Sequence, residues 1–180
     1  PLHRAWSASP AHADAPGDGW AVHDPTAVAW DAVTRTMRLD LLGHGGDALV
    51  LQLDRQGPVL DVVLELGHLD IDWGGQLVLA LGTTPDSPGL KLGRVGGGPV
   101  ALQRLGLWCG SVGDTFAQVS VPYATGPRRV RLSWVERDDG GELRCALDDQ
   151  AATVRTDLPP GSLPLRLTTR EVPSSPGRSR

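Results

Sequence analysis

The sequence predicts an all-β protein, folded as a two-sheet antiparallel β-sandwich. Turn signals rich in Gly, Pro and Asp recur at intervals of about 8 to 14 residues and separate short β-type runs. No window shows the 3.6-residue apolar period of an amphipathic helix. Because about a dozen strands in one flat sheet would leave both faces hard to cover, two packed layers are expected.

The strands are predicted from apolar and β-branched runs that lie between the turn signals. They are expected at 27–30, 36–42, 48–54, 59–66, 68–73, 76–82, 90–94, 101–109, 115–122, 128–137, 142–147, 153–156 and 163–169. Residues 1–19, rich in Ala, Pro, Asp and Gly, are expected to form a linker or a loosely ordered lead-in. Residues 20–170 then form the β-sandwich domain, and residues 171–180 have the composition of a flexible tail.

The segment from Trp134 to Asp149 predicts a β-hairpin with one apolar and one charged face. A two-residue type I′ turn at Asp139-Gly140 pairs Arg137 with Glu142, Arg131 with Asp148, Trp134 with Cys145 and Leu132 with Leu147. A turn at Gly140-Gly141 would instead oppose Arg137 and Arg144. The favoured register places the apolar side chains on one face: Val130, Leu132, Trp134, Leu143, Cys145 and Leu147.

Length and charge exclude several classes of protein. With 180 residues, the chain is long enough for one domain with a substantial core. The net charge of −4, without a long basic run, argues against a nucleic-acid partner. The sequence contains neither a signal peptide nor an apolar run long enough for a membrane span, so membrane insertion is not expected. Because the chain begins at Pro1 rather than Met, it is expected to be part of a longer protein.

The two cysteines, Cys109 and Cys145, are too few for a disulfide scaffold and lack the spacing of a metal knuckle. Both fall in predicted strands, which favours two buried thiols over a disulfide bridge. The bridge remains the alternative, and the cellular compartment stays open on this evidence.

The order of strands at both ends of the chain resembles that of concanavalin A-like and laminin-G-like jelly rolls. The closing part, VRLSWVERDDGGELRCALDDQAATVRTDLP, has a Trp-containing strand, a Gly-containing turn, a strand that runs into an Asp-containing turn, and a short final pair. The opening part, GWAVHDPTAVAWDAVTRTMRLDLLG, is similar to the first strands of such domains. The resemblance implies a jelly roll with one concave sheet, in which ligands bind on that sheet or on the loops at its rim.

His68, Asp70 and Asp72 form the sharpest candidate site, because alternation on a strand places them on one face. Laminarinase-like glycosidases of this superfamily carry Glu-x-Asp-x-Glu on a strand of the concave sheet. The segment is similar in spacing and in its central Asp70, but His68 and Asp72 stand where the two catalytic Glu would be. The alternative is that all three residues form a solvated strand face. No residue of the chain is predicted to be catalytic.

Metal binding is a weaker prediction. His68, Asp70 and Asp72 could supply three metal ligands, but the sequence offers no fourth ligand beside them. Laminin-G-like domains often hold calcium at a rim, and Asp47, Asp86 and Asp114 fall in predicted loops, but no Asp-x-Asp-x-Asp loop exists. Turn-forming roles are therefore expected for these three residues. No cofactor or metal site is predicted, although calcium is possible.

Six Trp residues stand beside one Phe and one Tyr, a balance that favours stacking on sugar rings. Trp73, Trp108 and Trp134 lie in apolar strand contexts and are expected in the core. Trp20 and Trp30 are expected to be exposed, as is Trp6. Trp20 and Trp30 join the candidate ligand-binding residues.

These observations favour a noncatalytic carbohydrate- or protein-binding module of a larger, extracellular or cell-surface protein. Its partners would be a glycan or protein ligand and the neighbouring domains of a longer chain. One alternative is a jelly-roll glycoside hydrolase or a related sugar-active enzyme. The other is a structural spacer domain whose loops contact its neighbours.

Overall fold

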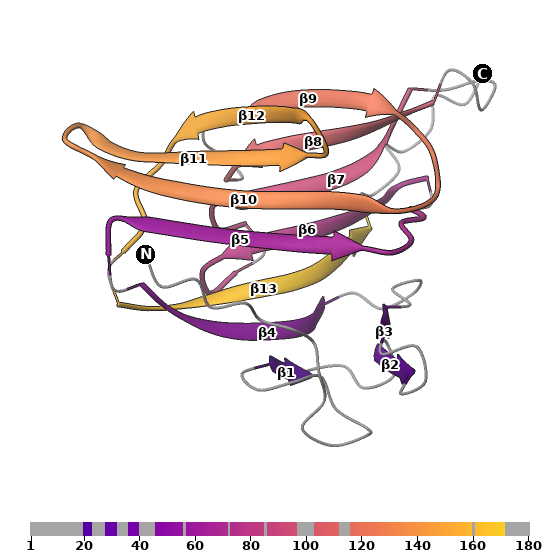
Figure 1. The fold of residues 1–180 in the computed structure, drawn as a ribbon, viewed down its shortest axis with the longest axis horizontal. Coiled ribbons are helices and arrows are strands. Elements are labelled where there is room, and N and C mark those ends of the chain that lie inside the picture. Colours follow the sequence, from indigo (N-terminus) through magenta and orange to yellow (C-terminus); the bar gives the residue numbers. More distant parts are fainter. Residues whose placement is uncertain are drawn as a thin grey trace, which may run out of the picture.

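The computed structural model describes ten ranges of the chain: 20–22, 28–31, 36–39, 46–55, 57–71, 73–84, 86–96, 103–111, 116–159 and 161–171. All regular structure in these ranges is β-strand, arranged in two packed antiparallel sheets and a separate strand pair (Figure 1). The predicted β-sandwich is therefore confirmed. The described ranges contain no helix that is long and apolar enough to span a membrane.

The larger sheet has seven strands in the order β1-β4-β13-β6-β7-β8-β9. Strands β6 to β9 follow one another in sequence, whereas the last strand, β13, is inserted between β4 and β6. The bounds are β1 (Trp20–Val22), β4 (Gly46–Arg55), β13 (Gly161–Glu171), β6 (Gly75–Leu81), β7 (Gly89–Val95), β8 (Arg104–Gly110) and β9 (Ala117–Pro122).

The smaller sheet has four strands in the order β12-β11-β10-β5 and lies in front of the larger sheet in Figure 1. Its bounds are β12 (Gln150–Arg155), β11 (Gly140–Leu147), β10 (Arg128–Arg137) and β5 (Val59–Leu66). Strands β2 (Val28–Asp31) and β3 (Thr36–Leu39) form the separate pair. The two sheets establish the sandwich, while the jelly-roll topology stays a prediction.

The core lies between the two sheets and is dominated by leucine. Alternate residues of each strand point inward, so each inner face is continuous and apolar. Strands β11 and β12 pack over β7, β8 and β9. The inner positions include Leu77, Leu79, Leu81, Leu90, Leu92, Leu105, Leu107, Leu132, Leu143, Leu147, Leu163, Leu165 and Leu167, all of which are buried.

The β10–β11 hairpin has the predicted faces but not the predicted register. All six residues of its predicted apolar face are buried. Its turn, however, lies at Asp138-Asp139, so that Arg137 pairs with Gly140 and Trp134 pairs with Leu143. Each β10 residue thus meets a partner two positions from the predicted one, and a shift of two leaves the inner and outer faces unchanged. Gly140, with φ of 115°, supplies the positive φ that follows the turn.

Packing of Trp134 decides this register, and charge pairing does not. The indole of Trp134 is 2% exposed and donates a hydrogen bond from Nε1 to the Thr156 carbonyl at 2.8 Å. It lies against Gly141, where a Cβ atom would collide with the indole and with the Thr156 carbonyl. Of the two predicted charge pairs, Arg137 and Glu142 lie 3.6 Å apart although they are not directly opposite, whereas Arg131 binds Asp61 instead of Asp148. Exposed ion pairs contribute about 1 kcal/mol or less, too little to outweigh indole burial.

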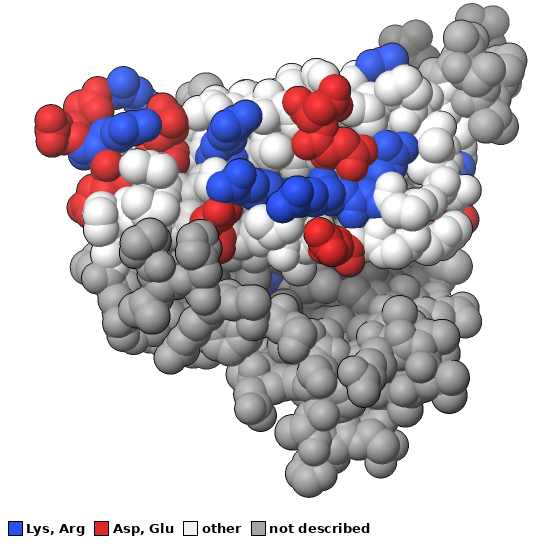
Figure 2. Space-filling model, in the orientation of Figure 1, with Lys and Arg blue, Asp and Glu red and all other residues white. Residues whose placement is uncertain are grey.

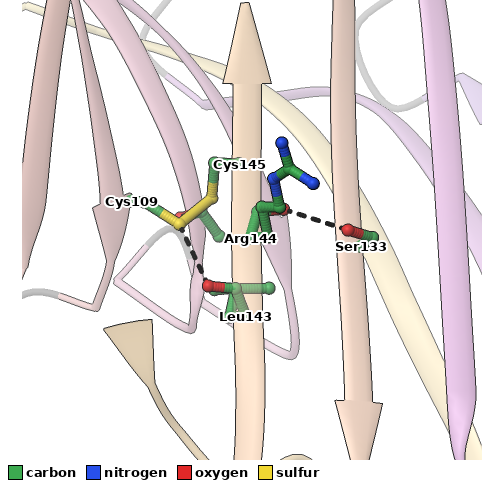
Figure 3. The surroundings of a disulfide bond; sticks show 6 residues. Cys109, Ser133, Leu143, Arg144 and Cys145 are labelled. Carbon is green, nitrogen blue, oxygen red and sulfur yellow. Dashed lines mark hydrogen bonds between the residues drawn. A yellow bond between two sulfur atoms is a disulfide. The ribbon is translucent and has the colours of Figure 1, made fainter. Parts of the chain in front are cut away.

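A disulfide joins Cys109 of β8 to Cys145 of β11, so the predicted pair of buried thiols is wrong (Figure 3). The two residues lie on facing inner surfaces, with their Cα atoms 5.5 Å apart, a separation that suits a disulfide. The Cys109 sulfur lies 3.7 Å from the Leu143 carbonyl oxygen. Because a bridged sulfur carries no hydrogen, this is a close contact rather than a hydrogen bond. The bond connects the two sheets covalently at the centre of the core.

Candidate functional site

The segment that carries His68 and Asp70 is not a strand, in contrast to the prediction for 68–73. It belongs to the connection that crosses from β5 in the smaller sheet to β6 in the larger one. The predicted alternation is nevertheless present, because His68 and Asp70 are exposed while Leu69 and Ile71 are buried. Leu69 and Ile71 anchor this connection in the core. Side chains can therefore alternate between buried and exposed here although the segment is not part of a sheet.

Three other predicted site residues cannot be placed at this segment. Asp72 lies outside the described residues. Trp20 lies in β1 and Trp30 in β2, and only their backbones are described. Of the five candidate ligand-binding residues, the structure therefore describes the surroundings of His68 and Asp70 alone.

Asp70 is bound to Tyr123 and Arg94, which sequence inspection did not connect with it. The Tyr123 hydroxyl donates to Asp70 Oδ1 at 2.5 Å, and Arg94 Nη2 donates to the same oxygen at 3.0 Å. Arg94 Nη2 also donates to the Tyr123 hydroxyl at 2.5 Å, and its guanidinium lies 4.0 Å from the centre of the Tyr123 ring. Asp70 is 54% exposed whereas Arg94 is only 16% exposed, so the group is anchored from the inside.

This cluster fastens two chain segments that cross between the sheets. Tyr123 begins the connection from β9 to β10, and Asp70 lies in the connection from β5 to β6. The amide of Ile71 donates to the Tyr123 hydroxyl at 3.3 Å, and the amide of Leu69 donates to the Gly126 carbonyl at 3.2 Å. The geometry therefore indicates a structural tie at one end of the sandwich.

The electrostatics of Asp70 disfavour a role in proton transfer. The hydrogen bond from Tyr123 lowers the pKa of Asp70; slight burial opposes this effect, and the hydrogen bond and charge of Arg94 add to it. For Arg94, burial favours the neutral form, but the interactions with Tyr123 and Asp70 outweigh it and raise the pKa. A carboxylate with a lowered pKa is a poor general acid or base near neutral pH.

We expect Asp70→Asn to lower the free energy of unfolding by about 1 kcal/mol at pH 7, a modest value because the carboxylate is half exposed. Since the folded-state pKa is lowered, the contribution of Asp70 is complete above its unfolded pKa and is lost as the pH falls through the folded value. The difference between the two proteins should therefore narrow below about pH 4. Urea unfolding of both proteins at pH 7, 5 and 3 measures this difference in the free energy of unfolding. Asp149→Asn is the control, and a gap that widens towards pH 3 would refute this role of Asp70.

The calcium ligands considered from the sequence are not brought together in the described residues. Asp47 falls within β4 rather than in a loop, Asp86 lies 3.9 Å from Lys91 Nζ, and Asp114 is outside the described ranges. In those ranges no group of three His, Cys, Asp or Glu residues is placed to hold a metal ion.

The tryptophans divide differently from the prediction. Trp134 is in the core as expected, but Trp73 is 48% exposed and Trp108 is half-buried on the outer face of the larger sheet. The sequence RLGLWCG of β8 explains the position of Trp108. Leu105, Leu107 and Cys109 point into the core, so Gly106 and Trp108 must point outward. Alternation along β8 alone predicts that Trp108 faces outward. Its apolar neighbours in the sequence had instead suggested a core position.

Trp108 lies over two glycines that face each other on neighbouring strands. Gly93 of β7 pairs with Gly106 of β8. A Cβ atom on Gly106 would lie 2.9 Å from Cη2 of Trp108, and one on Gly93 would lie 3.4 Å from Cζ3. The two glycines thus leave the space that the indole occupies beside the backbone of the sheet. We call Trp108, Gly93 and Gly106 the Trp108 platform.

Polar side chains and the apolar Val95 border the Trp108 platform. Lys91 of β7 and Gln118 of β9 lie directly opposite Trp108 on either side, and Gln76 of β6 lies opposite Gly93. Arg104 donates from Nε to Ser120 Oγ at 2.8 Å and from Nη2 to the Ser120 carbonyl at 2.6 Å. An aromatic ring is therefore bordered by amide, ammonium and guanidinium groups. Such a combination can stack on a flat ligand and form hydrogen bonds at its edges.

Comparisons with protein-family models, curated proteins and solved structures give no match for this chain. Function is therefore inferred from the chemistry of the Asp70 cluster and of the Trp108 platform.

Proposed function

We propose that this protein is a noncatalytic glycan-binding module with a concanavalin A-like fold, and that the Trp108 platform is its binding site. The main support for this proposal is the half-buried indole on the outer face of the larger sheet, where it lies beside the paired residues Gly93 and Gly106. Trp108 lies on the face opposite to the core between the sheets, where the neighbouring strand β6 also has the buried residues Val78 and Ala80. An aromatic face combined with hydrogen-bonding groups suits a sugar ring, which has an apolar face and a polar rim.

The predicted site around Asp70 has a supporting role in this proposal. Its carboxylate is already engaged by Tyr123 and Arg94, so it has less capacity to bind a ligand. The cluster does hold the end of β7, at Arg94, next to Val95, which pairs with Arg104 at the start of β8. Asp70 would therefore act by keeping these strand ends in place.

The disulfide between the sheets supports the proposal of an extracellular or cell-surface location. Disulfides form and persist in oxidising compartments and are rare in the cytosol of most cells. Both cysteines of the chain are used in this one bond. A glycan-binding module exposed to the extracellular medium, as part of a larger modular protein, is consistent with such a bond.

The proposal is tested with a glycan array followed by calorimetry on the glycans that bind. We expect Trp108→Ala to weaken binding by at least about 10-fold, the size of effect usual for a central aromatic contact. Gly106→Ala, whose new methyl group would displace the indole, should also weaken binding while the sandwich stays folded. Trp73→Ala removes an exposed tryptophan outside the platform and should bind as the wild type does.

Three results would contradict the proposal. Absence of binding to any glycan would refute the function itself and favour the structural spacer. Equal loss in the Trp73 and Trp108 variants would refute the location of the site. Cleavage of a bound glycan by the wild-type protein would show that the module is an enzyme.

A further inference from the structure

The guanidinium of Arg104 is held in place by Ser120, and no carboxylate among the described residues pairs with it. Arg104 is exposed, and its guanidinium donates two hydrogen bonds to Ser120, one to the hydroxyl and one to the carbonyl oxygen. In the part of the chain that the structure describes, Arg104 forms no ion pair. Of five guanidinium N–H groups, two bond to Ser120, and the described residues leave three for a ligand, including both on Nη1.

The register brings this guanidinium to the Trp108 platform. Ser120 of β9 pairs with Gly106 of β8, and Gly106 is the residue that the indole of Trp108 contacts. By binding Ser120, the side chain of Arg104 extends along the sheet to the level of Gly106. Gly106 has no side chain, and the groups nearest to the place of a Cβ atom there are Cη2 of Trp108, at 2.9 Å, and Cγ1 of Val95, at 3.0 Å.

On the outer face around the platform, Arg104 is the basic residue for which the described residues provide no ion-pair partner, whereas Lys91 lies 3.9 Å from Asp86. The outward positions of β7, β8 and β9 include Lys91 and Arg104, and none of them is Asp or Glu. The outer face of the smaller sheet is different, because Figure 2 shows basic and acidic residues interspersed on it. There, Arg131 binds Asp61 and Arg137 lies 3.6 Å from Glu142. In a chain of net charge −4, Arg104 therefore gives the described surroundings of Trp108 a positive group that no described carboxylate neutralises.

We propose that the platform selects glycans with an anionic substituent, a carboxylate or a sulfate ester, which Arg104 binds while the sugar ring stacks on Trp108. This inference rests on the proposed function and adds the class of ligand. Arginine suits the role because its planar fork forms paired hydrogen bonds with carboxylate and sulfate oxygens. Attachment to Ser120 orients the fork before the ligand arrives, which reduces the entropy lost on binding.

The test compares oligosaccharides that differ only in charge. Calorimetry is carried out with a galacturonate oligomer and its neutral methyl ester, and with sulfated and unsulfated forms of one glucan oligomer. We expect Arg104→Gln to weaken binding of a charged oligomer by about 10-fold and to change binding of its neutral counterpart less than 2-fold. The two pairs distinguish a carboxylate from a sulfate. Arg104→Lys, which retains the charge but not the fork, should fall between wild type and Arg104→Gln.

Arg129→Gln is the matched control, since Arg129 is an exposed arginine of β10, on the smaller sheet, and its loss changes the net charge equally. It should leave the preference for charged oligomers unchanged. Wild-type protein that binds charged and neutral oligomers equally would overturn the anionic selectivity but leave the glycan-binding function intact. Equal losses with both oligomers in Arg104→Gln would show that Arg104 only shapes the platform. Failure to bind any oligomer would overturn both proposals.

Discussion

Gly141→Ala is expected to lower the free energy of unfolding by about 3 kcal/mol or more. The new methyl group would collide with the indole of Trp134 and with the carbonyl of Thr156, two groups that also form a hydrogen bond with each other. Neither can move freely, because the indole is packed in the core and the amide of Thr156 bonds to the Gly141 carbonyl. Overpacking at such a site exceeds the usual cost of an added methyl group.

The measurement is denaturant unfolding followed by tryptophan fluorescence. Gly57→Ala is the matched control, since a Cβ atom there meets nothing within 4 Å. It should change stability by less than about 0.5 kcal/mol. If Gly141→Ala were as stable as Gly57→Ala, the contact between Trp134 and Gly141 would not set the register of the hairpin.

Removal of the disulfide is expected to have a comparable effect on stability. The bond joins residues separated by 36 positions, and its loop-closure entropy corresponds to about 4 kcal/mol at 25 °C. The double variant Cys109→Ala/Cys145→Ala should lose about this much free energy of unfolding, and each single variant should lose a similar amount because either change breaks the bond. Denaturant unfolding of the wild type in the presence of a thiol reductant provides the same comparison without mutation.

Thiol titration of the unfolded, unreduced wild-type protein is the accompanying control. It should detect no free thiol, since both cysteines are bridged. Two titratable thiols, together with a loss below about 1 kcal/mol in the double variant, would show that Cys109 and Cys145 are separate buried side chains, as their sequence context first suggested.

Burial of side chains by alternation could be predicted from the sequence, and most of the fold follows from it. The apolar face of β10 and β11 is an example, because its residues remain inward for any register shift of two. The register itself could not be predicted from charge. It depends on Trp134 bonding to Thr156, a contact between residues 22 positions apart that no local pattern encodes.

The site was harder to predict, because it depends on which strands become neighbours. The partners of Asp70 come from β7 and from the connection after β9, and only the folded order of strands brings them to Asp70. The disulfide has the same origin, since β8 and β11 belong to different sheets. Trp108 is different, because the alternation of side chains along a strand is enough to predict its side. Its neighbours Leu107 and Cys109 face the core, so Trp108 faces outward.

The position of β13 has a consequence for synthesis of the protein on the ribosome. Because β13 separates β4 from β6, the larger sheet cannot close until residue 171 has been made and has left the exit tunnel. The β10–β11–β12 meander needs only neighbouring residues and can pair earlier. Until β13 arrives, β4 and β6 each have an unpaired edge, which is the kind of surface that chaperones protect during translation.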